Sequence, residues 1–107
     1  ALGDIGTFFP SDNKKYKNAG SEVFLDFAFK KIKEKKYLIN NIDINIILES
    51  PKINQYIDTM KNNLSKILSI NSNDISIKVT TADKLGFIGK QKGIMSTSTI
   101  LIIKDER

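Results

Sequence analysis

The polar loop from Thr80 to Lys90 carries the side chains of this sequence that are best suited to chemistry on phosphates. It contains two adjacent hydroxyls, a carboxylate and two lysines, namely Thr80, Thr81, Asp83, Lys84 and Lys90. Hydroxyls donate neutral hydrogen bonds to phosphate oxygens, lysines contribute positive charge, and a carboxylate is a hard oxygen ligand that suits Mg²⁺. The structural alternative is a long connecting loop with a glycine-stabilised turn. The polar composition favours a functional loop.

Two other loops have a weaker signal for binding. Asp4-Ile5-Gly6, with residues 9–13, offers carboxylates and backbone amides, although an Asx turn explains this segment better when it is taken alone. Ser50-Pro51-Lys52 is expected between a strand and a helix, where unpaired backbone N–H groups and Lys52 favour an anion. Proline at such a junction is also common for structural reasons.

Apolar periodicity predicts two helices and three strands that would position these loops. Ser21 is the expected N-cap of a helix over residues 23–36, and apolar side chains at three- and four-residue steps predict a second helix over 53–69. Alternation predicts strands over 42–48 and 75–79, and a β-branched run over 94–103 predicts a buried or intersubunit strand. Residues 7–18 and 80–93 are expected to be loops, and 71–74 a turn.

This order of elements predicts an α+β fold. A strand–helix–strand unit makes a right-handed crossover, and the last strand can pair with the same sheet. We expect a two-layer sandwich in which a mixed sheet of three or four strands carries both helices on one face. The opposite face, with Thr97 and Thr99, would then meet solvent or another subunit.

Composition narrows the class of protein. The 107 residues contain no cysteine and no histidine, which excludes disulfides, thiolate metal sites and a histidine general base within this chain. No apolar run approaches the roughly 20 residues of a membrane-spanning helix, so no membrane partner is expected. The net charge of +5 comes from 16 lysines and one arginine, and 18 isoleucines and 10 asparagines point to A/T-rich coding rather than to a nucleic-acid partner.

Several short motifs follow one another in the order and spacing of one enzyme family. They are Asp4-Ile5-Gly6, Phe9-Pro10, Tyr16-Lys17, Ser21, Ile39-Asn40-Asn41-Ile42-Asp43, Pro51-Lys52-Ile53, Lys78-Val79-Thr80-Thr81, Lys84-Leu85-Gly86-Phe87-Ile88-Gly89 and Gly93-Ile94. Together they resemble the 2-C-methyl-D-erythritol 2,4-cyclodiphosphate synthases of the non-mevalonate isoprenoid pathway. The resemblance covers essentially the whole chain.

The resemblance implies a phosphorus–oxygen lyase. Such an enzyme converts 4-diphosphocytidyl-2-C-methyl-D-erythritol 2-phosphate to 2-C-methyl-D-erythritol 2,4-cyclodiphosphate, as the 2-phosphate attacks the β-phosphorus and CMP leaves. It also implies a homotrimer with active sites between neighbouring subunits and an isoprenoid diphosphate or another anion on the trimer axis. No nucleophile of the enzyme is required, so catalysis would consist of positioning and charge neutralisation.

The resemblance assigns roles to individual residues. Thr81 would stabilise the transition state, and Asp83 would bind Mg²⁺ or Mn²⁺. Substrate-binding residues would fall in four groups: Asp4, Ile5, Gly6, Phe9, Pro10, Ser11, Asp12 and Asn13 on the methylerythritol; Leu48, Glu49, Ser50, Pro51, Lys52, Ile53 and Asn54 around the cytidine of the neighbouring site; Thr80, Thr81, Ala82 and Asp83 on the diphosphate; and Phe87 and Lys90 near the trimer axis.

The chain also departs from the family pattern. Ser11-Asp12-Asn13 stands where Asp-Thr-Asp is usual, Ala82 replaces a threonine, Asp83 replaces a glutamate, and Lys90 and Lys92 replace an arginine and a glutamate. The Zn²⁺ of the family is held through histidines, which this sequence lacks. Residues 1–107 are therefore expected to be a single domain without its N-terminal part, inactive alone, with zinc ligands in a preceding segment.

Two other functions stay open from the residues alone. One is a non-catalytic module that binds cytidine nucleotides or phosphate through the same loops. The other is a basic RNA-binding domain, which would need stacking aromatic side chains on its strands, whereas the three predicted strands contain none. Codon bias and the resemblance together suggest a plastid-derived organelle such as an apicoplast, or alternatively the bacterial cytoplasm.

Overall fold

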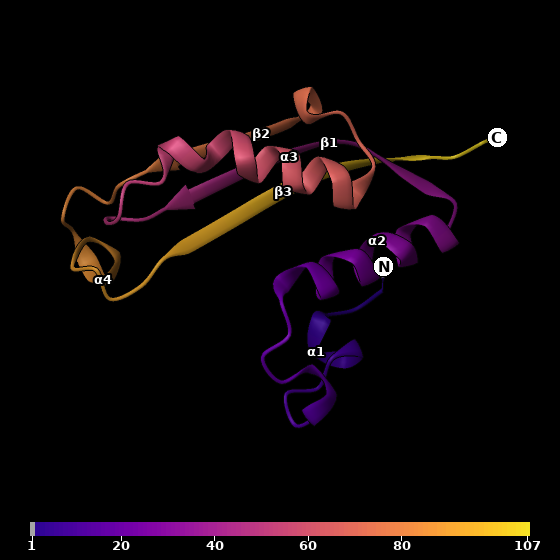
Figure 1. Cartoon of the computed structure of the whole chain (residues 1–107), viewed down its shortest axis with the longest axis horizontal. Coiled ribbons are helices and arrows are strands. Elements are labelled where there is room, and N and C mark those ends of the chain that lie inside the picture. The colour runs from indigo at the N-terminus through magenta and orange to yellow at the C-terminus, as the bar shows by residue number, and fades with distance from the viewer. Residues whose placement is uncertain (1) are drawn as a thin grey trace.

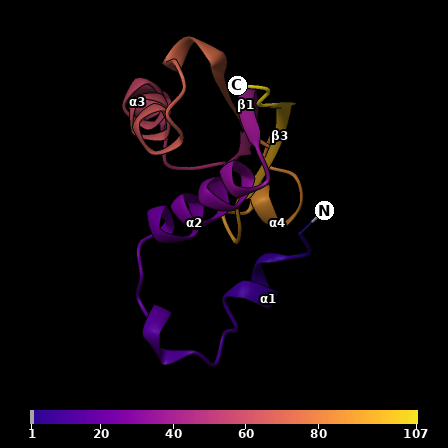
Figure 2. The same ribbon diagram turned by 90° about the vertical axis from the view of Figure 1, so that its right-hand side faces the viewer.

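The computed structural model describes residues 2–107 and shows one mixed sheet with two helices on one face (Figures 1 and 2). The strands are β1 (Tyr37–Ile47), β2 (Ile75–Thr80) and β3 (Met95–Lys104), in the order β2-β1-β3. β1 is parallel to β2 and antiparallel to β3. The long helices α2 (Ser21–Glu34) and α3 (Ile57–Leu68) form the second layer. The predicted α+β fold with a mixed sheet is confirmed.

The core lies between β1, β2 and the two helices. Ile42 and Ile46 of β1 and Ile75 and Ile77 of β2 are buried on the face that the helices cover. Phe29 of α2 and Leu68 of α3 join the same core, together with several half-buried residues of α3. The period-2 burial of the strands and the apolar stripe of α3 are the signals that predicted this packing.

A β-bulge allows β1 to keep its apolar side chains on the core side. Ile39 pairs with Ile102 and Asn41 pairs with Leu101, so Asn40 is an extra residue in β1. Without it, Ile39 and Ile42 would point to opposite faces, since they are three residues apart. Both are buried in the same cluster with Phe29.

The first strand is longer than predicted. It begins at Tyr37 rather than at residue 42 because residues 37–41 pair with the C-terminal half of β3. The sequence did not predict this part of the strand because it contains the polar residues Asn40 and Asn41. The extension also places one aromatic residue, Tyr37, in a strand, whereas the predicted strands contain none.

The helix boundaries differ from the prediction at both helices. Gly20, not Ser21, is the N-cap of α2, and no side chain caps this helix. The helix ends at Glu34, and Lys36 takes a left-handed φ of 66° before β1. The second helix is divided into a 3₁₀ turn (Asn54–Tyr56) and α3, which begins only at Ile57. The apolar pattern continues through both segments, so it did not predict the change from a 3₁₀ turn to an α-helix.

Short helical turns occupy segments that were expected to be irregular. Residues 7–18 contain the end of α1 (Ile5–Phe8) and a 3₁₀ turn (Lys14–Tyr16), and residues 80–93 contain α4 (Gly86–Gly89). The expected turn at 71–74 includes a 3₁₀ turn (Ser72–Asp74). Among residues 2–107, none of the helices has the length and apolar character needed to cross a membrane.

The third strand lies where it was predicted, but it is not buried within the chain. All ten residues of β3 are exposed, among them Ile100, Leu101, Ile102 and Ile103. The reason is that α2 and α3 cover β1 and β2, whereas β3 lies on the other side of β1, beyond these helices (Figure 2). The alternative of an intersubunit strand stays a prediction.

The core predicts unequal costs for truncating two strand isoleucines. Ile75→Ala should lower the free energy of unfolding by about 2–5 kcal/mol, because a 2% exposed side chain leaves a cavity. The matched change Ile100→Ala removes a 42% exposed side chain and should cost under about 1 kcal/mol. Urea denaturation at low protein concentration measures both. Equal losses would show that β3 is covered in solution.

Candidate active site

The parallel pairing of β1 and β2 brings two of the three candidate loops together. Ile47 is in register with Thr80, and the N–H of Leu48 donates to the carbonyl of Thr80 at 3.0 Å. The carboxyl ends of parallel strands share one edge of a sheet, where open α/β sheets bind ligands. Residues 48–54 and 80–90 therefore begin side by side, at the end of the sheet near α4 (Figure 1).

Thr81 and Asp83 form a small hydrogen-bonded turn directly after β2. The Oγ1 of Thr81 donates to Oδ1 of Asp83 at 3.4 Å and accepts from the Asp83 N–H at 3.3 Å. Thr80, in turn, donates through Oγ1 to the Thr81 carbonyl at 3.4 Å. All three side chains are exposed and these bonds are long, so a phosphate oxygen could replace them at low cost.

The chain then reverses direction in a turn of unusual backbone geometry. Asp83, Lys84 and Gly86 have φ angles of 52°, 65° and 65°. The Leu85 N–H donates to the Ala82 carbonyl at 3.0 Å, and α4 follows at once. A left-handed conformation costs a non-glycine residue roughly 1–2 kcal/mol, so contacts around this turn must stabilise it.

Two contacts hold the turn at Lys84. The Lys84 N–H donates to Oε1 of Glu49 at 2.9 Å, which links the loop after β1 to the loop after β2. Gly89 also lies close to the Lys84 backbone: a Cβ at position 89 would stand 2.7 Å from Cα and 2.9 Å from the carbonyl oxygen of Lys84. Neither contact was predicted from the sequence. The only sequence signal was the glycine itself, three residues after Gly86.

The loop after β1 exposes its charged residue and anchors its apolar ones. Leu48 and Ile53 are half-buried against the core cluster of Ile46, Ile75 and Ile77. Ser50, Pro51 and Lys52 between them are exposed. The expectation of a helix N-terminus at Lys52 was wrong, since α3 begins five residues later and a 3₁₀ turn intervenes. Any anion near Lys52 would depend on its ammonium group rather than on helix amides.

The residues expected near a trimer axis lie on and after α4. Phe87 is 60% exposed, and its ring packs beside Gly93, where a Cβ would come within 3 Å of it. Lys90 is exposed at the C-cap of α4. Leu85 and Ile94 are exposed close by in the chain, so this end of the molecule presents apolar surface and lysines together.

The first candidate segment lies apart from the other two within one chain. It packs on α2, while residues 48–54 and 80–90 gather near α4 (Figure 1). Asp4 is the N-cap of α1, since its Oδ1 accepts from both the N–H and Oγ1 of Thr7 at 3.0 Å. Asn13 caps the next 3₁₀ turn through Lys15 N–H. The Asx turn expected from the sequence is therefore present.

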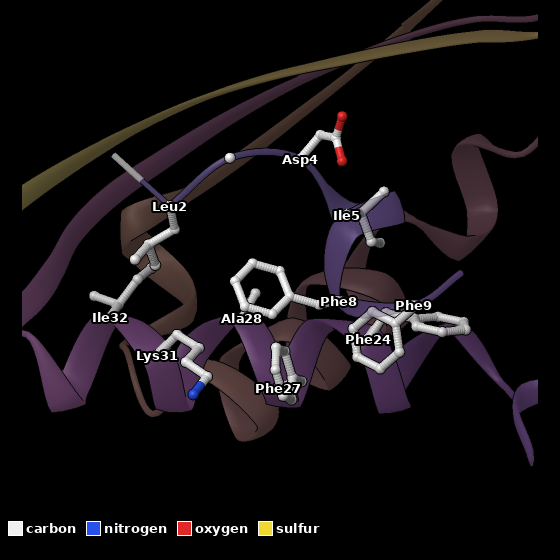
Figure 3. A pocket seen from close by; sticks show the side chains of 11 residues that line it. Leu2, Asp4, Ile5, Phe8, Phe9, Phe24, Phe27, Ala28, Lys31 and Ile32 are labelled. Atoms are coloured by element: carbon white, nitrogen blue, oxygen red, sulfur yellow. The ribbon is translucent and has the colours of Figure 1, made fainter. Parts of the chain in front are cut away.

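Phe9 packs in a cluster of aromatic side chains and is not fully exposed to solvent. Its ring meets those of Tyr16, Phe24 and Phe27 at centroid distances of 4.8, 4.7 and 4.8 Å, nearly edge to face. Figure 3 shows Phe8, Phe9, Phe24 and Phe27 around an apolar cavity of about 270 Å³, while Asp4 points away from it. The cluster fixes residues 2–9 on α2, and Pro10, Ser11 and Asp12 follow it as an exposed turn.

The described residues offer few metal ligands. No group of three or more Asp, Glu, His or Cys side chains comes together within residues 2–107. A zinc site does not fit this part of the protein, because zinc prefers histidine and cysteine donors and the chain has neither. Mg²⁺ fits better at Asp83, since it is often bound by one carboxylate together with substrate phosphates and water.

Comparison with known proteins agrees with the motifs. The profile of the YgbB family matches residues 1–103. The chain belongs to the YgbB family. It is similar to the 2-C-methyl-D-erythritol 2,4-cyclodiphosphate synthase of Buchnera aphidicola, with 46% identity over 106 residues, which are 99% of this chain and 64% of that relative. It is also 50% identical over 101 residues to the bifunctional enzyme IspD/IspF of Bartonella bacilliformis, covering 94% of this chain and 25% of that enzyme.

Solved structures give the same result for the fold. The CDP complex of Plasmodium falciparum IspF superposes on this YgbB-family chain with a TM-score of 0.83 at 40% identity, covering 96% of this chain and 61% of that one. Bifunctional IspDF from Campylobacter jejuni gives a TM-score of 0.91 at 35% identity, covering 99% and 29%. The family resemblance is confirmed, and the chain spans about two-thirds of the length of its single-function relatives. The roles of individual site residues stay predictions.

The close approach at Gly89 predicts a selective effect of alanine. Gly89→Ala should lower the free energy of unfolding by about 1–3 kcal/mol and shift the NMR signals of residues 81–86, because the new methyl group displaces the Lys84 backbone. Gly6→Ala is the matched control. Its Cβ would find the nearest atom 3.5 Å away in a helix, so no loss is expected. Thermal unfolding that is insensitive to Gly89→Ala would contradict the packing described here.

Proposed function

We propose that this chain is part of a 2-C-methyl-D-erythritol 2,4-cyclodiphosphate synthase of isoprenoid precursor biosynthesis, a phosphorus–oxygen lyase. Membership of the YgbB family and the synthases among its relatives support this proposal. The observation in the fold that carries it is the juxtaposition of residues 48–54 with Thr80, Thr81 and Asp83. That arrangement can hold a nucleoside on one loop and its diphosphate on the next.

The reaction needs only positioning and charge neutralisation from these loops. An oxygen of the substrate's 2-phosphate attacks the β-phosphorus, the bond from that phosphorus to the bridging oxygen breaks, and CMP leaves with that oxygen. The Thr81 hydroxyl donates to a non-bridging oxygen, where negative charge is redistributed in the transition state. Lys52 lies in the loop proposed to hold the cytidine, and Asp83 provides a carboxylate for Mg²⁺ or Mn²⁺, which would neutralise diphosphate charge when bound.

The proposed assembly is a homotrimer with its active sites between subunits. Asp4 and the loop carrying Thr81 lie apart in one chain. A neighbouring subunit would therefore have to bring the methylerythritol-binding segment to residues 80–90, the proposed phosphate loop. The exposed apolar strand β3 supports this assembly, because large exposed apolar surfaces mark interaction sites. Phe87 and Lys90 would then approach the trimer axis, where an isoprenoid diphosphate or another anion could offset the lysines.

A zinc ion would need donors from outside these 107 residues, since the chain contains neither histidine nor cysteine. We therefore expect the isolated chain to be inactive. A plastid-derived organelle, or alternatively the bacterial cytoplasm, is the proposed location. Relatives from a bacterium and a structure from Plasmodium falciparum are compatible with both.

A CMP-release assay tests the activity. A protein that joins this chain to the part of the Buchnera aphidicola relative that the chain does not match should release CMP in the presence of Zn²⁺ and Mg²⁺. In that protein, Thr81→Ala should lower kcat roughly 30- to 1,000-fold, which corresponds to about 2–4 kcal/mol of transition-state stabilisation. Thr81→Ser keeps the hydroxyl and should retain most of the rate.

Two results would contradict this proposal. Unchanged turnover in Thr81→Ala would show that this hydroxyl does not face the diphosphate. CMP release by rigorously pure 107-residue chain would show that a zinc site is not required.

A non-catalytic cytidine nucleotide-binding module is the second candidate. The observation in its favour is that one chain brings together only the two loops that would bind cytidine and diphosphate. Calorimetry should then detect cytidine diphosphate binding to the isolated chain without CMP release, and Lys52→Ala should weaken that binding about tenfold through loss of a positive charge. Lys61→Ala, on α3, is the control and should leave the affinity unchanged. No heat at millimolar nucleotide would rule this module out.

A further inference from the structure

The carboxylate of Glu49 joins two loops that are far apart in the sequence. Glu49 is half-buried just after β1, and its Oε1 accepts the backbone N–H of Lys84 at 2.9 Å. A hydrogen bond between a charged carboxylate and a backbone N–H is stronger than one between neutral groups. The resemblance placed Glu49 among the residues around the cytidine. Its observed partner is instead the backbone of the phosphate loop.

This hydrogen bond is made where the backbone of the phosphate loop has its least favourable conformation. Asp83 and Lys84 are consecutive non-glycine residues with left-handed φ angles. Gly89 also lies close to the Lys84 backbone, and the Gly89 N–H donates to the Leu85 carbonyl at 2.9 Å. Lys84 thus contacts both Glu49 and Gly89, the last residue of α4. Asp83 and Thr81, which precede Lys84 closely and bond to each other, take their position from it.

We propose that Glu49 is a positioning residue that sets the geometry of the phosphate loop and couples it to the loop after β1. Glu49 immediately precedes Ser50-Pro51-Lys52, so a ligand that orders this segment also fixes the acceptor for Lys84. Thr81 and Asp83 are then already ordered before a diphosphate binds, so its binding costs less conformational entropy. The consequence for ligands rests on the proposed function, whereas the positioning of Lys84 does not.

Amide hydrogen exchange tests the positioning directly. In Glu49→Ala, the Lys84 N–H should lose about tenfold in protection, because its acceptor is gone, and the signals of residues 81–86 should shift. Glu49→Gln keeps a side-chain oxygen at the same reach and should retain the protection. Glu106→Ala, a matched truncation of an exposed glutamate near the C-terminus, should change neither.

The core amides of Ile46 and Ile75 show whether an effect is local. They should keep their protection in all three variants. Equal loss at Ile75 and Lys84 in Glu49→Ala would mean that Glu49 acts through global stability, and unchanged protection at Lys84 would mean that the bond is not formed. Either result overturns the proposal.

Nucleotide titration tests the coupling separately. Glu49→Ala should bind cytidine diphosphate about tenfold more weakly than the parent, and Glu49→Gln within about twofold of it. Equal weakening in both variants would show that the Glu49 carboxylate touches the nucleotide, which contradicts a positioning role. If the parent chain binds no cytidine diphosphate, the proposal that this chain binds nucleotides is wrong. Hydrogen exchange of the Lys84 amide still shows whether Glu49 positions the loop.

Discussion

The parallel pairing of β1 with β2 is the constraint on which the candidate site depends. It brings Ile47 into register with Thr80, so both strands end at the same edge and both loops start from it. The pairing is stabilised on one face by buried isoleucines and on the other by an ion pair in which Lys78 Nζ lies 3.0 Å from Asp43 Oδ2. That ion pair is exposed and contributes little, so apolar burial sets the register.

The backbone of residues 80–90 is shaped by its surroundings more than by its own sequence. Two consecutive left-handed residues are unfavourable by themselves, and Lys84 makes its contacts with Glu49 and Gly89 at this point. The hydroxyl of Thr81 stays exposed and makes only long bonds to Asp83. Exposed hydroxyls with only long hydrogen bonds are suited to phosphate binding, because little reorganisation precedes contact with the ligand.

One chain presents two different kinds of surface. The aromatic cluster around Phe9 holds the N-terminal segment on α2, away from the phosphate loop, whereas β3 leaves apolar side chains exposed along the edge of the sheet. Both features agree with an assembly that completes the site from more than one subunit, as proposed above.

The sequence by itself determined the fold class, the three strands, the two long helices and the family. Period-2 alternation and helical apolar stripes record which face of each element is buried, and several motifs in register are specific to one family. It did not determine the start of β1 at Tyr37, the 3₁₀ turn before α3 or the short helix α4. Those depend on pairing with β3 and on packing, which local patterns do not encode. Only the tertiary structure showed that Glu49 reaches Lys84, because a hydrogen bond between residues 35 positions apart exists only after the parallel strands have paired.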